Sequence, residues 1–351
     1  MFTFEAIKQA KSQGDIPTDN SENGVPYIVQ SMFNNMVSRN VNKQWLIENN
    51  EAPVSGNRIV LGVTLPAVSY QPKEFGASQV ITAKASWLNE KNGVYIATAI
   101  SKLMYKFSYN QKPGMQIYKD LKIQLPITNG KIDFDFIESF IAELEKQHIS
   151  KLDAYLLSSG LKDYTLTIDE QQILDCFDNI EWGYFNLGNL FGKSTRGRRL
   201  KSEDRIPGTL PFVTAGEAEE GVSAFIGNDV IIFSENTTTI DMFGSAKYRN
   251  YKYGGDDHVA IVHTENLQKF AAIFVTAAIH KSSHTGKFDY GRNFYAKDAD
   301  ELSILLPVKD QKPNYATMET IISAIHKLVI KEVVLYVERK IATTKTVVSK
   351  N

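Results

Sequence analysis

The sequence predicts a mixed α/β protein made of two similar domains in tandem, each followed by a long helix. Two repeated patterns indicate the duplication. Leu125-Pro126-Ile127 and Leu306-Pro307-Val308 each precede a charged stretch with helical periodicity. Farther upstream, Val25-Pro26-Tyr27-Ile28 resembles Leu210-Pro211-Phe212-Val213. The copies lie about 180 residues apart, far more than the period of a solenoid repeat, so each copy is a domain.

Short patterns predict the elements inside each domain. Residues 57–61 (NRIVL) and 228–232 (NDVII) resemble each other and are predicted as equivalent strands, because both are apolar and bounded by turn residues. Residues 259–262 (VAIV) are a further strand-like run. The Ala-rich run 270–279 predicts a buried helix, and residues 94–103 are its counterpart in the first copy.

Two long helices are predicted over residues 133–157 and 317–341. Each would be about 38 Å long, which exceeds the usual length of a helix in a globular protein. Asp133 is the predicted N-cap of the first helix. In both helices apolar residues recur at spacings of three and four, so each helix has one apolar seam.

Two arrangements of these helices are open. Each helix could pack on its own domain, or the two could pair as a coiled coil. Charge favours pairing, because residues 132–179 carry three basic and eleven acidic side chains, whereas residues 309–351 carry eight basic and four acidic ones. The predicted pairing residues are Ile137, Ile141, Leu144, Ile325, Val329 and Val333.

The predicted boundaries are residues 1–128 for the first domain, 129–160 for the first helix, 161–308 for a linker and the second domain, and 309–351 for the second helix and tail. A chain of 351 residues is long enough for two cores. Its single cysteine excludes an internal disulfide and a Cys-rich zinc site. Because neither a membrane-length apolar run nor a signal-peptide pattern is present, we expect a cytoplasmic protein without a membrane partner.

The sequence has no motif that supports catalysis or cofactor binding. Residues 188–194 (GNLFGKS) resemble a phosphate loop, but three residues separate the glycines where the motif needs four. His280 and His284 could share a helical face, but no cysteine or acidic third ligand lies near them in sequence. No two prolines are adjacent, so the Pro-Pro loop of adenine-N6 DNA methyltransferases is missing. We therefore expect no catalytic residue, no cofactor and no metal.

Basic clusters are candidates for contact with DNA. The net charge of −1 argues against nucleic acid, but residues 193–201 carry five cations on a loop, and cations alternate with aromatic residues over 247–253 and 287–295. Arginine and lysine bind phosphates, and arginine also reads guanine. Each cluster taken singly is equally typical of a solvated surface. The candidate residues are Lys84, Trp87, Lys102, Lys106, Lys193, Arg196, Arg198, Arg199, Lys247, Arg249, Lys252, Lys287 and Arg292.

The whole pattern resembles the specificity subunit of type I restriction–modification systems. In the second copy the resemblance rests on residues 182–191 (WGYFNLGNLF), 208–216 (GTLPFVTAG) and 303–308 (SILLPV). In the first copy it rests on residues 25–29 (VPYIV) and 121–127 (LKIQLPI), again before a long helix. The opening of the first copy, residues 4–9, matches weakly.

The resemblance implies that each domain is a target recognition domain that binds one half of a split site in double-stranded DNA. It implies that the two helices form an antiparallel coiled coil that sets the spacing of the halves. It also implies two DNA adenine methyltransferase subunits as partners, which carry S-adenosylmethionine, and a motor and nuclease subunit for cleavage. Because the chain is short for such a subunit, a compact relative that partners a fused restriction–methylation polypeptide is a further possibility.

Two other classes of function compete with DNA recognition. An enzyme with a duplicated α/β fold is disfavoured, because the methyltransferase loop, the nucleotide loop and a metal cluster are missing. A duplicated protein-interaction scaffold that never touches DNA is kept open by the near-neutral net charge.

Overall fold

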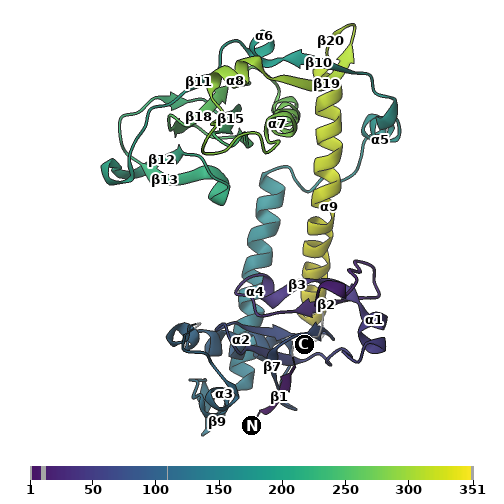
Figure 1. Ribbon diagram of the computed structural model, residues 1–351. Coiled ribbons are helices and arrows are strands. Elements are labelled where there is room, and N and C mark those ends of the chain that lie inside the picture. Colours follow the sequence, from purple (N-terminus) through teal and green to yellow (C-terminus); the bar gives the residue numbers. More distant parts are fainter. Residues whose placement is uncertain (1, 9–12, 109, 349–351) are drawn as a thin grey trace. The chain divides into compact units, whose positions relative to one another are not determined.

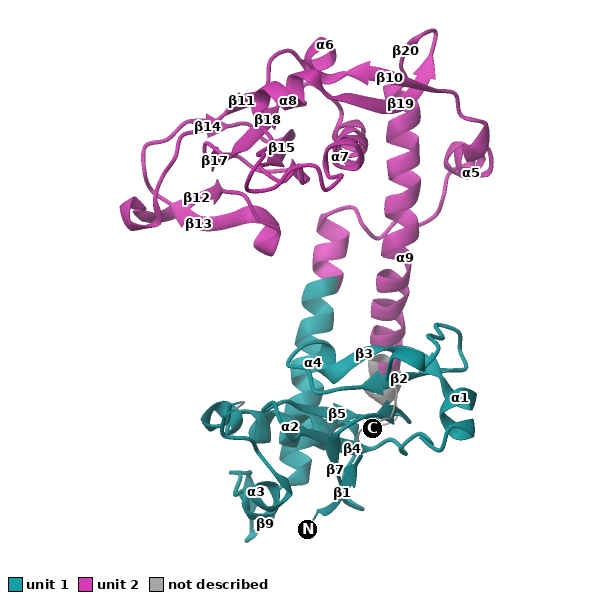
Figure 2. Cartoon of the chain, viewed as in Figure 1, with its two compact units in different colours: residues 1–152, 344–351 teal, residues 153–343 magenta. Residues whose placement is uncertain are grey.

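The computed structural model describes residues 2–8, 13–108 and 110–348, with side chains in the last helix described as far as Thr343. Residue 9 of the first copy's opening and residues 349–351 of the predicted tail lie outside the described residues. The chain divides into unit 1 (residues 1–152 and 344–351) and unit 2 (residues 153–343) (Figure 2). In both copies a mixed α/β region precedes a long helix in the sequence, as predicted (Figure 1).

The described part of unit 1 contains an antiparallel sheet in the order β1-β7-β4-β5 and a smaller sheet in the order β3-β2-β6. The strands are β1 (Thr3–Ile7), β2 (Gly24–Ile28), β3 (Val37–Asn42), β4 (Arg58–Gly62), β5 (Val68–Gln71), β6 (Gly76–Ala77) and β7 (Val80–Lys84). The helices are α1 (Lys43–Glu48), α2 (Glu90–Ser101) and α3 (Met115–Asp120). Helix α2 packs on the first sheet, where Ile96 and Ile100 share a core with Ile59 and Ile81.

Unit 2 contains sheets in the orders β11-β18-β15-β16, β13-β12-β17-β14 and β10-β19-β20. The strands are β10 (Trp182–Asn186), β11 (Thr195–Arg196), β12 (Pro207–Val213), β13 (Val222–Ile226), β14 (Ile232–Phe233), β15 (Thr237–Asp241), β16 (Ala246–Arg249), β17 (Tyr253–Gly255), β18 (Val259–Val262), β19 (Ser303–Lys309) and β20 (Lys312–Pro313). The helices are α5 (Ile168–Asp175), α6 (Leu187–Phe191), α7 (Lys269–Ser283) and α8 (Ala296–Glu301). Helix α7 is the predicted Ala-rich helix, and its Val275 and Ile279 are fully buried.

The two units share one strand order and register, which confirms the duplication. Strand β4 lies between β5 and β7 as β15 lies between β16 and β18, with every pairing antiparallel. In the smaller sheets, Tyr27 pairs in parallel with Gly76, and Phe212 pairs in parallel with Gly254. The predicted equivalence of the Pro-containing segments in β2 and β12 is therefore confirmed.

The predicted equivalence of residues 57–61 with residues 228–232 is wrong. Ile232 starts β14, which belongs to the smaller sheet, whereas the counterpart of β4 in unit 2 is β15. Strand β15 reads Thr-Thr-Thr-Ile-Asp, and all five residues are buried. A search for apolar, β-branched runs misses this strand, because the burial of its threonines depends on hydrogen bonds supplied by the fold, such as that between Thr238 and Thr276 of α7.

A hydrogen bond between equivalent side chains occurs in both units. The Tyr70 hydroxyl donates to the Asn57 side-chain oxygen at 2.8 Å, and the Tyr248 hydroxyl donates to the Asn236 side-chain oxygen at 2.8 Å. Both asparagines precede the equivalent strands and have positive φ values of 56° and 63°, a conformation that asparagine tolerates better than most residues. The duplication therefore extends to individual contacts of the framework.

The long helices are α4 (Phe134–Ser158) and α9 (Tyr315–Val348), and each follows a short hairpin. The first hairpin is formed by β8 (Ile127–Thr128) and β9 (Lys131–Ile132), and the second by β19 and β20. Asp133 accepts from the Phe136 N–H at 2.8 Å, so the predicted N-cap is confirmed. No helix in the described part of the chain is long and apolar enough to cross a membrane.

The first turns of α4 pack on unit 1. Phe134 contacts Trp87 with ring centroids 5.0 Å apart, and Phe140 contacts Tyr95 of α2 at 6.0 Å. Glu138 accepts a hydrogen bond from the Asn89 side chain at 2.6 Å. The start of the helix is thus fixed to its own domain. The pairing of α4 with α9 stays a prediction.

Helix α5, which the sequence patterns do not predict, is fixed to α9 within unit 2 by a buried carboxylate. Glu170 is 5% exposed and accepts hydrogen bonds from the Ser323 hydroxyl at 2.5 Å and the Lys327 ammonium at 2.8 Å. It also accepts from the Thr167 N–H at 2.7 Å in a capping box. Burial alone raises the pKa of Glu170, but these three donors outweigh burial and lower the pKa to about 2.

Glu170→Gln is expected to lower the free energy of unfolding by about 2 kcal/mol at pH 7, because a charged, multiply bonded carboxylate is lost. The folded pKa lies below the ordinary value of 4.5, so ionised Glu170 stabilises the fold above that pH and loses this effect as the pH falls. The difference between wild type and variant should therefore narrow from about pH 5 to about pH 3. Chemical denaturation measures it, with the exposed Glu332→Gln as control. Equal stability of Glu170→Gln and wild type at pH 7 would contradict this role.

Candidate nucleic-acid interface

The basic loop of unit 2, residues 193–201, carries exposed cations on a fixed backbone. Lys193, Arg196, Arg198 and Arg199 are all exposed. The loop is fixed at Gly197, where an added Cβ would lie 1.6 Å from the carbonyl oxygen of Gly255, so only glycine permits this close approach. The side chains can therefore vary in direction, while the loop itself is held against the sheet.

The basic loop forms one wall of a groove of about 480 Å³, here called the unit 2 groove. Arg205 holds this wall in place. Its guanidinium donates to the Leu200 carbonyl at 3.3 Å and to the Ser223 hydroxyl at 3.2 Å, and it lies over the Phe212 ring at 5.2 Å. The residues that line the groove are Arg199, Leu200, Lys201, Ser202, Glu203, Arg205, Thr214, Ala215, Met242, Asp256 and His258.

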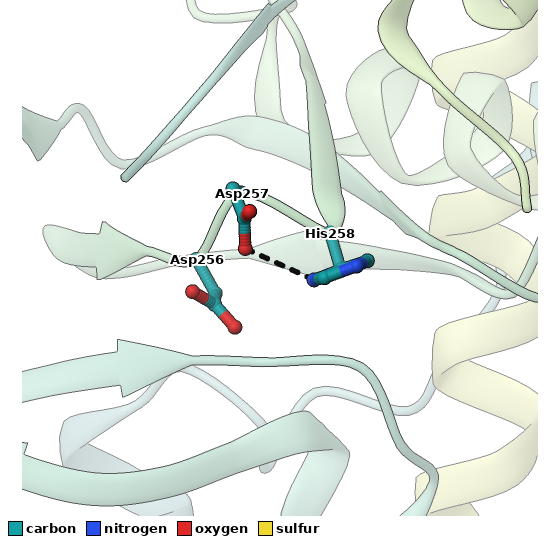
Figure 3. A group of neighbouring side chains, drawn as sticks. All are labelled: Asp256, Asp257 and His258. Carbon is teal, nitrogen blue, oxygen red and sulfur yellow. Dashed lines mark ion pairs between the residues drawn. The ribbon is translucent and has the colours of Figure 1, made fainter. Parts of the chain in front are cut away.

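Asp256 and His258 also line the groove, with Asp257 between them in sequence (Figure 3). His258 Nδ1 lies 2.9 Å from a carboxylate oxygen of Asp257. Burial, and to a smaller extent the charge of Asp257, raises the pKa of Asp256 above the ordinary value of 3.8. Hydrogen bonds from the backbone N–H groups of Asp257 and Leu200 act in the opposite direction and only partly offset this rise. The possible ligand atoms of the three residues lie within 4.8 Å of one another, but all three side chains are partly exposed and consecutive, and we assign no metal to them.

The two histidines considered as zinc ligands have a structural position. The rings of His280 and His284 stack at 4.8 Å. His280 Nδ1 accepts a hydrogen bond from the Ala246 N–H at 3.1 Å, which fixes α7 to β16. One ring nitrogen is therefore already used within the fold.

Arg249, predicted to contact DNA, is instead an interior residue with 1% exposure. Its guanidinium donates to the Thr239 hydroxyl at 2.9 Å, the Tyr251 hydroxyl at 3.0 Å and the Glu220 carbonyl at 2.9 Å. Glu220 has a φ of 56°, so Arg249 holds a left-handed turn. The Arg and aromatic alternation of this segment thus reflects packing at Arg249, whereas Lys252 is exposed.

Unit 1 has the same support at the equivalent position. Gln71 pairs with Arg58 in β4 as Arg249 pairs with Thr237 in β15. The Gln71 side chain donates to the Asn35 carbonyl at 2.8 Å, and Asn35 has a φ of 50°. In both units a long polar side chain on the edge strand fixes the same left-handed turn.

The other cations of unit 2 differ in exposure. Lys247 is only 15% exposed and forms ion pairs with Glu217 at 3.3 Å and Asp241 at 3.9 Å. Lys287 is exposed, and Arg292 is 70% exposed, with its guanidinium over the Phe288 ring at 5.4 Å. Lys287 and Arg292 thus remain exposed, although the Arg292 guanidinium also lies 3.8 Å from the Asp298 carboxylate, whereas Lys247 is engaged within the fold.

The candidates in unit 1 are also divided. Trp87 lies between Phe2 and Phe134, with centroids 5.0 Å from each, so it belongs to an aromatic cluster. Lys84 forms an ion pair with Glu5 at 2.8 Å. Lys102 lines a groove of about 490 Å³ beside α2 and β5, and Lys106 is exposed next to Tyr105.

Comparison with known proteins decides the family. Residues 4–154 and 179–335 match the family described as "Type I restriction modification DNA specificity domain". The chain belongs to this family. The matched regions are two copies of one specificity domain, as the shared strand order indicates. Because the family is one of DNA specificity domains, the prediction of a DNA-recognition chain without catalysis is confirmed.

Two relatives support this placement. The chain is 26% identical over 311 residues to the "Type II restriction enzyme BgcI specificity subunit S.BcgI" of Heyndrickxia coagulans, across 85% of each chain. The crystal structure of a type I restriction–modification S subunit from M. genitalium aligns with 99% of this chain and 94% of its own length. Its TM-score is 0.56 at 15% sequence identity, which shows a common fold.

The specificity domain of unit 2 contains residues that the sequence patterns do not single out. Asp256 and His258 line the groove from the turn between β17 and β18, and Arg205 supports the basic loop. A lone Asp-Asp-His before a strand carries no signal in sequence. Only the fold brings this turn beside the basic loop, where Gly255 lies against Gly197.

Proposed function

We propose that the two specificity domains each read one half of a bipartite target in double-stranded DNA. The observation that supports this most strongly is a shared framework with different surfaces. The contacts of Tyr70 and Tyr248, and of Gln71 and Arg249, are repeated. Strand β1 in unit 1 occupies the place that β11 of the basic loop occupies in unit 2. The residues of β1 and its flanks carry no positive charge comparable to that of the exposed residues 193–201. Two domains of one fold with different side chains are suited to read two different sequences.

The long helices would set the distance between the half-sites by pairing as an antiparallel coiled coil. Of the predicted pairing residues, Ile137 and Ile141 are buried, whereas Leu144 is 41% exposed. On α9, Ile325, Val333 and especially Val329, at 72%, are exposed. Residues on a helix seam that retain exposure are available to a further protein.

Because Ile325, Val329 and Val333 are exposed, we assign the exposed stripe on α9 to methyltransferase docking, in place of the prediction that these three residues pair with α4. The stripe's apolar residues are spaced three and four positions apart, so they lie on one face of the helix. Exposed apolar patches of this kind mark sites of contact with other proteins. The stripe comprises Ile325, Leu328, Val329, Val333 and Tyr336. The partners would be two DNA adenine methyltransferase subunits, with a motor and nuclease subunit for cleavage. A fused restriction–methylation polypeptide is the alternative partner, and the similarity to a specificity subunit of a type II restriction enzyme shows that such subunits are not confined to type I systems.

The basic loop provides a direct test of DNA binding. Arg198→Ala combined with Arg199→Ala should weaken binding to duplex DNA and lower the slope of log affinity against log salt concentration by about 2, because two phosphate contacts are lost. Titration of labelled duplex by the chain with its methyltransferase partner, over a range of salt, measures this slope. Lys73→Ala with Lys91→Ala removes the same charge from exposed positions outside the predicted clusters and should leave the slope almost unchanged.

The same titration separates the competing functions. Absence of salt-dependent binding by the wild-type complex would favour the interaction scaffold. An unchanged slope in the loop variant would place the DNA surface elsewhere. Methyl transfer by the isolated chain would favour an enzyme.

A further inference from the structure

The loop between β2 and β3 of unit 1, residues 29–36, has the same backbone as the loop between β12 and β13 of unit 2, residues 214–221. In both loops the last three residues have left-handed φ values, which are 48°, 50° and 67° in unit 1 and 47°, 56° and 79° in unit 2. The Val29 N–H donates to the Met36 carbonyl at 3.1 Å, and the first and last residues of the unit 2 loop make the same bond at 2.9 Å. The two loops are therefore equivalent residue by residue.

Contacts near both ends hold the β2–β3 loop in one conformation. The Gln71 side chain of β5 donates to the Asn35 carbonyl at 2.8 Å. The Gln30 side-chain oxygen accepts from the N–H groups of Val63 and Leu65, in the turn after β4, at 2.9 Å and 3.1 Å. A ligand that contacts the tip of this loop therefore does not have to order its backbone, which favours binding.

The side chains at the tips of the two loops differ. The β2–β3 loop carries no charge, and its Met32 and Phe33 are 58% and 81% exposed. The equivalent residues of unit 2 are Glu217 and Ala218, and two further glutamates follow them. An exposed phenyl ring in unit 1 thus stands where unit 2 has a methyl group, on a backbone that is held in the same way.

Each loop lies next to a groove that contains a cation, and this links the loops to DNA through the proposed function, on which this inference rests. In unit 2 the loop begins at Thr214, which lines the unit 2 groove together with Arg199. In unit 1 Asn35 of the loop lines the groove beside α2, together with the exposed Lys102. A lysine or arginine in these places can bind a phosphate while the loop meets the bases.

The chemistry of the phenyl ring narrows what it can contact on DNA. The ring has no cation or hydrogen-bond donor for a phosphate. In the major groove the apolar group on a base edge is the C5-methyl group of thymine, and phenylalanine is suited to contact it. Insertion of the ring between base pairs is the alternative. The equivalent loop favours contact with base edges, because its exposed Glu219 can accept from the amino group of cytosine in the major groove but cannot insert between bases.

We propose that Phe33 is a specificity-determining residue of unit 1, which packs on the C5-methyl group of one thymine in the major groove. Lys102 in the adjoining groove supplies a cation for the DNA backbone. Gln71 is a positioning residue, because it holds the loop through the Asn35 carbonyl. The equivalent loop of unit 2, with Ala218 and its glutamates, presents different groups to the bases, so the two half-sites differ.

Replacement of thymine by deoxyuridine tests the assignment, because it removes the C5-methyl group and changes nothing else. The full chain, bound to its methyltransferase partner, is titrated with its target duplex and with duplexes in which each thymine in turn is replaced. For wild type, one position of one half-site should lose affinity by about fourfold, as for the burial of one methyl group. In Phe33→Ala, which carries the residue of unit 2, the two duplexes should bind equally at that position, because the shorter side chain no longer reaches the methyl group. The other half-site should respond as in wild type.

A matched substitution controls for the loss of a phenyl ring. Phe177→Ala makes the same change at a 41% exposed phenylalanine between the two matched regions, and should keep the wild-type affinity and its dependence on the methyl group. Phe33→Ala should unfold at the wild-type temperature, because the ring is mainly exposed.

The outcomes separate this assignment from the proposed function. Methyl dependence that persists in Phe33→Ala at every position would overturn the assignment. Weaker binding of Phe33→Ala to a target with no methyl-dependent position in wild type would also overturn it, in favour of insertion, and unchanged binding to such a target would remove Phe33 from the DNA surface. If the wild-type complex selects no gapped motif, the proposed function itself fails, which is a different result.

Discussion

We expect deletion of residues 145–148 from α4 to shorten the unspecified spacer of the DNA target by about two base pairs while both half-sites stay the same. One helical turn of four residues is about 6 Å long, and base pairs rise by about 3.4 Å. These residues are all exposed, so the deletion removes no core contact. It also leaves the contacts of Phe134, Glu138 and Phe140 with unit 1 untouched.

Sequencing of methylated sites in cells that express the variant with its methyltransferase measures the spacer. Replacement of the same four residues by alanine preserves the length of the helix and should leave the spacer unchanged. A deletion variant that methylates sites with the wild-type spacer would show that α4 does not set the distance between the half-sites.

Val329→Asp should abolish assembly with the methyltransferase while the chain stays folded. Val329 is 72% exposed at the centre of the apolar stripe on α9, so the change costs the free chain little. In a complex the new carboxylate would be buried without a partner, which is strongly unfavourable. We expect the affinity for the methyltransferase to fall by about 100-fold, as for the loss of a central contact residue.

Co-purification of the tagged chain with its partner measures this loss. Lys331→Asp places the same charge on the same turn at an exposed polar position and should retain the partner. Recovery of wild-type amounts of methyltransferase with Val329→Asp would assign the docking surface to another part of the chain.

The sequence predicts the features of this fold that depend on local patterns. The start of α4 follows from Asp133 and the apolar spacing after it, and the duplication follows from repeated Leu-Pro segments before the helices. The equivalent of β4 could not be found in this way. Thr237–Asp241 is polar in composition, and its burial depends on partners from other elements, such as Thr276.

In the candidate site, too, some features follow from local sequence patterns and others depend on contacts made by the fold. The basic loop is exposed as its composition suggests, although Glu203 and Asp204 follow it closely and Lys201 lies 3.8 Å from the Glu203 carboxylate. Arg249 has the same composition around it, yet its guanidinium is enclosed by Thr239, Tyr251 and the Glu220 carbonyl. Which cation is buried depends on the strand register, and which acid enters the groove depends on the turn after β17. Neither is encoded in a local pattern.

The central claim is that two specificity domains in one chain read two half-sites. Mapping of methylated adenines across genomic DNA, in cells that express this chain with its methyltransferase, tests it most directly. The account predicts one motif made of two short, dissimilar half-sites separated by a fixed number of unspecified base pairs. A continuous, ungapped motif would contradict it.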